Sequence, residues 1–280
     1  GTGIKFASLT PDGKILDKTS TPTPETLEEL LAWLDQRLSE QDYHGIAMSV
    51  PGAVHQETGV IEGISAIPYI HGFSWYEALA HYQLPVHLEN DANCVGLSEL
   101  LAHPEIENAT CVVIGTGIGG AMIINGKIHR GRHGLGGEFG YMTTIEPAEK
   151  LNNWSQLAST GNMVRYVIEK SGQTDWDGRK IYQEAAAGNA LCQEAIERMN
   201  RNLAQGLLNI QYLIDPDVIS LGGSISQNPD FIKGVQKAVE VFVERYEEYT
   251  IAPVIQACTY QADANLYGAL VNWLQEENQW

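Results

Sequence analysis

Gly115-Thr116-Gly117-Ile118, followed by the turn Asn125-Gly126, decides the fold, because the same pattern already opens the chain. There it reads Gly1-Thr2-Gly3-Ile4, with Pro11-Asp12-Gly13 as its turn. Each copy predicts a strand, a tight turn and a second strand. Glycines allow close approach of a ligand, and exposed amides beside a threonine hydroxyl suit phosphate oxygens. The repetition therefore predicts two lobes with phosphate held by both copies.

One Gly-Thr-Gly alone is weak evidence, since most glycine-rich hairpin turns bind nothing. Repetition in the same strand context favours phosphate binding, and the second copy directly follows the apolar run Cys111–Ile114. Neither copy matches the Gly-Lys-Ser/Thr loop of nucleoside triphosphatases or the dinucleotide fingerprint that opens a helix. A nucleotide would thus be bound by a different architecture.

Composition limits the class of partner. The chain has 280 residues, 44% of them hydrophobic, and 35 acidic against 17 basic residues give a net charge of −18. This charge opposes nucleic-acid binding but is compatible with ATP held by local amides and Mg²⁺. No apolar run reaches the roughly 20 residues of a membrane span, and the four cysteines are scattered. We expect a cytoplasmic protein that binds neither nucleic acid nor membrane.

Apolar spacing predicts the main elements. A helix is expected from Thr23-Pro24 along the leucines of residues 27–38, a strand at 86–88 and a helix at 92–103. Later helices are expected at 181–214, 230–246 and 264–275, with strands at 218–222 and 254–257. The lobe boundary is expected near residue 108, giving lobes of 1–108, joined by the C-terminal helix 264–280, and 109–263.

Asp91 is the candidate general base. It lies in Glu89-Asn90-Asp91-Ala92-Asn93, between a predicted strand and a predicted helix. A carboxylate beside two amides can take a proton while the amides fix hydroxyl groups of a substrate. On spacing alone, a helix N-cap explains the same residues equally well.

Four motifs together resemble the sugar kinases of the ROK family (repressor, open reading frame, kinase). They occur in the family's order over nearly the whole chain and are listed here: Leu88–Asn93, Ile114–Gly120, Gly137–Gly140 and Leu221–Gly223. The resemblance implies an α/β protein with the actin-like, ribonuclease-H-like ATPase fold, two lobes with a cleft between them, and a homodimer. It also implies transfer of the ATP γ-phosphate, with Mg²⁺, to a sugar hydroxyl, normally O6 of a hexose.

The resemblance also assigns roles to residues. Asp91 would accept the hydroxyl proton, while Asn90, Asn93 and Glu138 would bind sugar hydroxyls. The residues expected around ATP are Gly1, Thr2, Gly115, Thr116, Gly117, Gly222 and Gly223. The family motif Asp-x-Gly-Gly-Thr is represented here only by its last two residues, so we expect its acidic residue upstream of Gly1.

Two departures from the family concern zinc and the acceptor. Tyr141 replaces the family's zinc-ligating histidine, and residues 151–155 lack its cysteines, so we expect no structural zinc and a loop ordered by packing around Trp154. Tyr69 replaces the usual asparagine after proline, and Ser155 stands where glucose-type members place a glutamate. These substitutions favour space or an aromatic face for a group at C1. The chain thus resembles glucokinases and β-glucoside kinases without the zinc motif.

Alternatives remain open. A non-catalytic, sugar-sensing ROK regulator would share the sugar site, and a different actin-like ATPase would share the phosphate turns but would not need Asn90–Asn93. A glycosidase using Asp91 and Glu138 would leave the glycine turns unexplained. The basic cluster of residues 129–133 either contacts phosphate or is an ordinary solvated loop.

Overall fold

The computed structural model describes residues 3–63, 65–144 and 152–280, which form two compact units. Unit 1 consists of Gly1–Pro104, Arg130–Leu135 and Asp263–Trp280. Unit 2 consists of Glu105–His129 and Gly136–Ala262. The chain therefore leaves unit 2 after His129, contributes six residues to unit 1 and then returns.

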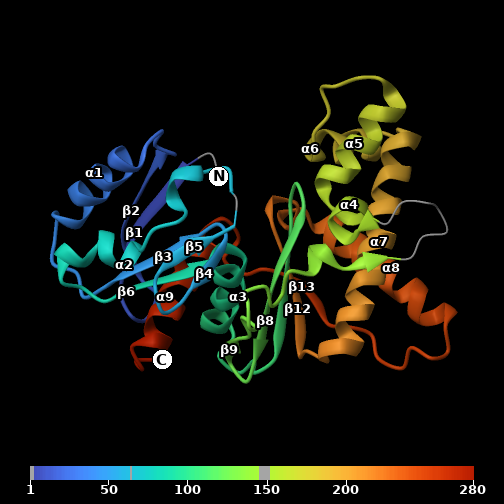
Figure 1. Ribbon diagram of the computed structural model, residues 1–280. Coiled ribbons are helices and arrows are strands. Elements are labelled where there is room, and N and C mark those ends of the chain that lie inside the picture. Colours follow the sequence, from blue (N-terminus) through green and yellow to red (C-terminus); the bar gives the residue numbers. More distant parts are fainter. Residues whose placement is uncertain (1–2, 64, 145–151) are drawn as a thin grey trace. The chain divides into compact units, whose positions relative to one another are not determined.

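Unit 1 is built on paired strands (Figure 1). The hairpin β1 (Gly3–Leu9) and β2 (Ile15–Pro22) is antiparallel, as the turn at Gly13 predicts. The pair β3 (Ile46–Val50) and β6 (Val86–Asn90) is parallel, with Val50 opposite Asn90. A short antiparallel pair, β4 (Ala53–His55) and β5 (Val60–Glu62), follows β3. The carboxyl end of β6 thus lies beside the end of β3.

The helices of unit 1 cover these strands. Their bounds are α1 Leu27–Leu38, α2 Trp75–Ala78, α3 Asp91–Ala102 and α9 Ala264–Glu276, with short 3₁₀ turns at Pro68–Ile70, Ala80–Tyr82 and Gln261–Asp263. The core includes Leu30, Ile61, Trp75 and Leu88. Helix α9 packs on α3 so closely that a Cβ at Gly268 would collide with the backbone carbonyl of Cys94. Backbone contact therefore fixes α3 against α9.

Helix α1 starts later than its sequence pattern predicts. Thr26, not Thr23, is the N-cap, and its hydroxyl accepts the Glu29 N–H at 3.2 Å. The Glu29 carboxylate accepts the Glu25 N–H at 3.0 Å, which completes a capping arrangement before Leu27. Pro24 remains outside the helix, so the predicted helix start at Thr23-Pro24 was wrong.

Unit 2 contains a five-stranded sheet in the order β13-β12-β7-β8-β9. The strands are β7 Ala109–Ile114, β8 Ile118–Ile124, β9 Lys127–Ile128, β12 Val218–Gly222 and β13 Ile255–Ala257. β12 is parallel to β7 and β13, whereas β8 is antiparallel to β7 and β9. Asn125 and Gly126 both have positive φ in the β8–β9 turn, as Asn-Gly predicts.

The remaining elements of unit 2 are mostly helical. They are α4 Trp154–Ala158, α5 Thr160–Ser171, α6 Gly178–Ala186, α7 Ala190–Ile214 and α8 Pro229–Arg245, with 3₁₀ turns at Phe139–Tyr141 and Ser224–Gln227 and short strands β10 Thr143–Thr144 and β11 Asn152–Asn153. Two helices replace the single one predicted over 181–214, because Gly188 has a φ of 96° and Asn189 caps α7. Buried Trp154 lies in the core, and its indole N–H donates to the Asn202 carbonyl at 2.9 Å. Trp154 is thus buried as expected, while its role in ordering the preceding loop stays a prediction, because residues 145–151 lie outside the described residues. None of the helices described is long and apolar enough to cross a membrane.

Candidate functional site

At the turn from β6 into α3, different residues account for helix capping and for the candidate base, which the sequence alone could not distinguish. Asn90 is the N-cap of α3, and its Oδ1 accepts the backbone N–H groups of Ala92 (2.9 Å) and Asn93 (3.1 Å). Its Nδ2 donates to the Gly52 carbonyl at 3.1 Å, which ties the turn to the end of β3. Since Asn90 caps the helix, the neighbouring carboxylate of Asp91 is not needed for that purpose.

Asp91 is the first residue of α3, and its side chain reaches the surface. One carboxylate oxygen accepts the Ala92 N–H at 2.9 Å. Asn265 of α9 donates to the Asp91 backbone carbonyl at 3.2 Å, which fixes the main chain. Desolvation by the surrounding protein raises the pKa of Asp91 above its ordinary value, although the Ala92 hydrogen bond acts in the opposite direction. A raised pKa makes this carboxylate a better proton acceptor.

Asn93 is turned into the protein. It is buried, and its Nδ2 donates to Oε1 of the buried Glu89 at 2.9 Å. In this orientation the Asn93 amide links the first turn of α3 to the end of β6, and its contact with a sugar stays a prediction. We therefore treat Asn93 as a residue that orders the turn.

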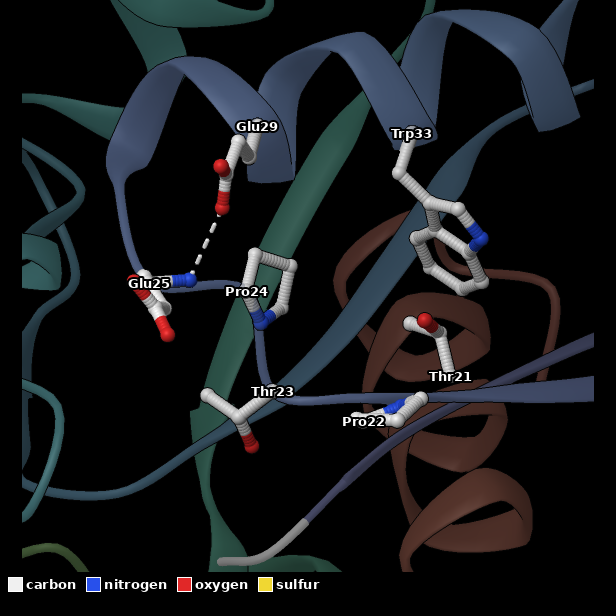
Figure 2. A pocket seen from close by; sticks show the side chains of 7 residues that line it. All are labelled: Thr21, Pro22, Thr23, Pro24, Glu25, Glu29 and Trp33. Carbon is white, nitrogen blue, oxygen red and sulfur yellow. Dashed lines mark hydrogen bonds between the residues drawn. The ribbon is translucent and has the colours of Figure 1, made fainter.

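Tyr69 also has a partner within unit 1. Its hydroxyl donates to the Pro24 carbonyl at 2.6 Å. Pro24 lines a shallow hollow between the end of β2 and α1, in which the Trp33 ring faces a rim of threonine and proline side chains (Figure 2). The full lining is Thr21, Pro22, Thr23, Pro24, Glu25, Glu29 and Trp33. Because the Tyr69 hydroxyl donates its proton to Pro24, it can meet a ligand only as an acceptor, beside the apolar surface of the ring.

In unit 2, predicted nucleotide residues meet at the carboxyl edge of the sheet. The turn Gly115–Gly117 joins β7 to β8, and the Gly115 N–H donates to the Gly117 carbonyl at 2.9 Å. Gly222 ends β12 opposite Val113 of the parallel strand β7. A Cβ at Gly223 would collide with the Ile114 carbonyl, so only glycine allows the diglycine turn to lie this close. A Cβ at Gly115 would meet nothing within 4 Å, so the turn has an open side.

The start of α5 supports this turn and was missed from the sequence. The Gly161 N–H donates to the Gly115 carbonyl at 3.1 Å, and a Cβ at Gly161 would collide with the backbone of Thr116. Ser159 caps the helix by accepting the Asn162 N–H. The sequence signal was Ser159-Thr160-Gly161, a cap followed by a small residue, at a distance along the chain that gave no reason to connect it with Gly115.

Glu138 precedes the 3₁₀ turn Phe139–Tyr141 and is half-buried, while Tyr141 is the last residue of this turn and is 72% exposed. Ser155, at the position of a family glutamate, is bound to the backbone of Ile118: it accepts the N–H at 2.8 Å and donates to the carbonyl at 3.2 Å. Gly1, Thr2 and Leu151 lie outside the described residues. Over the rest of the chain, no group of three or more His, Cys, Asp or Glu side chains is arranged to hold a metal ion.

Comparison with known proteins identifies the family of the chain. A family model described as ROK family matches residues 1–276. The chain belongs to the ROK family. A β-glucoside kinase of Listeria monocytogenes is 34% identical to this ROK protein, over 100% of the chain and 96% of the relative.

Solved structures agree with the family and the fold. A ROK family protein from Streptococcus pneumoniae TIGR4, in complex with sucrose, is 90% identical with a TM-score of 0.98, covering 100% of this chain and 97% of that one. A Streptomyces griseus glucokinase in complex with glucose and AMPPNP is 23% identical with a TM-score of 0.75, covering 96% and 95%, and at this identity shows the fold. The α/β, actin-like fold expected from the motifs is thus confirmed.

Proposed function

We propose that this ROK protein is an ATP-dependent kinase that phosphorylates a hydroxyl group, O6 of a hexose or β-glucoside, with Asp91 as general base. Its class is carbohydrate kinase, since curated relatives over the full chain are named as β-glucoside kinase and glucokinase. The choice of base rests on one observation at the β6–α3 turn: the helix is capped by Asn90 and not by Asp91. Asn90 caps the helix, and Asp91 presents a carboxylate of raised pKa at the surface.

In the proposed reaction, Asp91 accepts the proton of the attacking hydroxyl as the γ-phosphoryl group transfers. An amide nitrogen carries two N–H groups, so Asn90 can donate one to Gly52 and the other to a sugar hydroxyl. Glu138 would accept hydrogen bonds from further ring hydroxyls. The chain contributes mainly positioning, because phosphoryl transfer depends on alignment and charge stabilisation.

The nucleotide half of the proposal rests on the glycine turns of unit 2. Gly115, Thr116 and Gly117 would surround the phosphates, Gly222 and Gly223 would lie against the adenosine, and Gly1 and Thr2 would complete the set. The open side at Gly115 and the close packing at Gly223 support this assignment. Mg²⁺ arriving with ATP would neutralise phosphate charge during transfer.

We further propose that the acceptor sugar carries a substituent at C1. Tyr69 and Tyr141 provide ring surface where the family has polar residues. Ser155 is shorter than the glutamate of glucose-type members, and its hydroxyl is bound to the backbone of Ile118. A β-glucoside kinase among the relatives and the sucrose complex of the 90% identical structure support an acceptor larger than free glucose.

We also propose a cytoplasmic homodimer. The cysteines described, Cys94, Cys111, Cys192 and Cys258, are buried and form no disulfide with one another, which supports a reducing compartment. Exposed apolar side chains occur near the C-terminal ends of α7 and α8 and in the segment that follows α8, and we call this set the apolar patch: Tyr212, Leu213, Val241, Tyr246, Ile251 and Val254. The Tyr212 hydroxyl accepts the Thr250 N–H at 2.9 Å, which orders the patch. A second copy is the proposed cover.

The test is ATP-dependent phosphorylation of glucose, mannose, N-acetylmannosamine, fructose, cellobiose and sucrose, with wild type, Asp91→Asn and Asp42→Asn. Asp42 is an exposed acid of the same unit and serves as control. We expect turnover on a β-glucoside or disaccharide, a loss on the order of 10² to 10⁴ or more in Asp91→Asn, and none in Asp42→Asn.

Two results would redirect the proposal. Strong preference for free glucose over cellobiose would remove the C1 substituent but keep the kinase. Tight sugar binding without turnover on any acceptor would indicate a regulator, and ATP hydrolysis at a normal rate without sugar would indicate another actin-like ATPase.

A further inference from the structure

Glu89 is a buried carboxylate directly before the catalytic turn. It is 1% exposed, and both its oxygens have donors. Oε1 accepts the Asn90 backbone N–H at 2.7 Å and the Asn93 Nδ2 at 2.9 Å, while Oε2 accepts the Arg130 Nε at 2.6 Å. One carboxylate therefore holds the residue before Asp91 and the residue two positions after it.

Arg130 begins the segment Arg130–Leu135, which we call the strap, because it joins unit 1 although both its flanks belong to unit 2. The guanidinium also reaches α9, where an Nη donates to Asn272 Oδ1 at 2.9 Å and lies 3.2 Å from the Glu276 carboxylate. The Arg130 side chain is 28% exposed. It thus links the strap, the end of β6 and α9.

An ionised carboxylate at this depth needs a partner, because desolvation of an unpaired charge costs several kcal/mol. Arg130 supplies that partner through a charge-assisted hydrogen bond. With its charge balanced, Glu89 remains a double acceptor for Asn90 and Asn93. The orientation of the peptide that leads into Asp91 follows from this pairing.

We propose that Arg130 and Glu89 are positioning residues for the phosphoryl-transfer site, acting on Asp91 through Asn90 and Asn93. This inference rests on the proposed function, because it assigns a role relative to the Asp91 base. The strap leads along the chain into Gly136, Gly137 and Glu138, so anchoring Arg130 also fixes where the segment carrying Glu138 departs from unit 1.

Removing the Arg130 charge has an electrostatic consequence. In Arg130→Met, Glu89 and Glu276 lose their shared cationic partner, so the negative charge beside the turn, two residues along the chain from Asp91, is no longer balanced. Tyr76 and Cys94 also face this group; both are neutral at pH 7, since their ordinary pKa values already lie above 7 and burial raises each pKa further. A nearby anion raises the pKa of a carboxyl, so the acid limb of the kcat profile should move to higher pH.

The experiment compares kcat, the sugar KM and the acid limb of kcat in wild type, Arg130→Met, Arg130→Lys and Glu89→Gln/Arg130→Met. Arg132→Met is the matched control, because Arg132 is an exposed residue of the same strap. We expect Arg130→Met to lose 10- to 100-fold in kcat, the order produced by about 1 Å of misplacement, with a sugar KM within about threefold of wild type.

Each variant separates charge from geometry. The double variant replaces the ion pair by neutral groups, so its acid limb should return to the wild-type pH even if kcat stays low. Arg130→Lys keeps the positive charge but lacks the several N–H donors of the guanidinium. Its acid limb should therefore lie at the wild-type pH, while its kcat should lie between those of Arg130→Met and wild type. Should Arg130→Met fail to fold, the double and Lys variants carry the same comparison.

Three outcomes would overturn the inference. One is wild-type kcat and pH profile in Arg130→Met; another is an equal loss in Arg132→Met, which would indicate a general effect of basic residues. The third is a loss of thermal stability in Arg130→Met with an unchanged acid limb of kcat, which would indicate that the Arg130–Glu89 pair has only a structural role. If Asp91→Asn is inactive while Arg130→Met is normal, the kinase stands and the positioning role falls; if wild type phosphorylates nothing, both fall.

Discussion

Asp91 combines surface exposure with a raised pKa, and this has a measurable effect on catalysis. A general base works only when deprotonated, so kcat should fall as the pH decreases through the pKa of Asp91. Because desolvation raises that pKa, the acid limb should lie above the range of an ordinary aspartate, whose value is 3.8. Measurement of kcat between pH ~4 and ~8 checks this. A flat profile down to the lowest pH would contradict a raised pKa.

The same shift predicts a stability effect of Asp91→Asn. The folded-state pKa of Asp91 is raised, so its contribution to stability is present at low pH and is lost as the pH rises through the folded pKa. Removing the charge should leave the Tm at neutral pH equal to or above that of wild type, and the difference should vanish in acid. Thermal unfolding at both pH values measures it. A lower Tm at neutral pH would show that the carboxylate stabilises the fold.

The side chains around Asp91 show how far the sequence reaches at this scale. The motif Asn90–Asn93 correctly predicted a strand-to-helix turn, because capping residues and apolar spacing are local signals. It could not show which amide caps the helix and which is buried. That choice depends on Glu89, whose partner Arg130 lies 41 residues away. A basic loop such as residues 129–133 looks solvated until its acceptor is known.

At the scale of elements, the contact between α5 and the Gly115–Gly117 turn predicts a selective defect. In Gly161→Ala the new methyl group would push against the Thr116 backbone and displace the turn. We expect the ATP KM to rise by about tenfold or more while the sugar KM changes little, because the displaced turn is the one proposed to hold the ATP phosphates. A misplacement of about 1 Å at such a site can cost about 10²-fold in activity. Steady-state kinetics with each substrate varied in turn checks this. Equal changes in both KM values would argue against a nucleotide role.

The crossing of α3 and α9 predicts a stability defect. Gly268→Ala places a methyl group on the Cys94 carbonyl, so the helices must separate, at a cost of about 3 kcal/mol. Gly234→Ala in α8 is the matched control, because its new contact is the Asn200 side chain, which can move. The control should cost less than about 1 kcal/mol, offset by higher helix propensity. Urea unfolding measures both; equal costs would contradict the backbone contact.

Element boundaries show the limit of pattern reading. The helices at 230–246 and 264–275 were predicted to within one residue because their apolar spacing is regular, and Asn228 also caps the first of them. The break before α7 was missed because apolar spacing continues on both sides of Gly188. The start of α1 was misplaced because Thr-Pro and Thr-Leu both resemble a cap, and the hydrogen bonds of Glu29 with Thr26 and Glu25 distinguish them.

At the scale of the whole molecule, the apolar patch predicts the effect of a charge on assembly. Leu213 is 78% exposed, so Leu213→Glu should dissociate the proposed homodimer without unfolding the chain. Leu16→Glu is the control, since Leu16 is 60% exposed in unit 1, outside the patch. Sedimentation measures the mass of each variant. A dimer that survives Leu213→Glu would place the interface elsewhere.

The fold as a whole could be predicted because its four motifs are distributed along the chain in a fixed order, and a resemblance of this kind uses all of them at once. Assignment of the strap to unit 1 could not be predicted. The residues on both sides of the strap belong to unit 2. The six residues of the strap, mostly basic residues and glycines, contain no sequence signal that one of them pairs with a residue of β6.

The division of unit 1 into three stretches affects the order in which the protein folds during synthesis. Helix α9 covers α3, β3 and β6, yet the ribosome delivers it after every residue of unit 2. Unit 2 can therefore fold first, while the apolar side of unit 1 waits for its last helix. A nascent chain paused before residue 264 would present that surface to chaperones, and slow codons late in the message would lengthen the exposure.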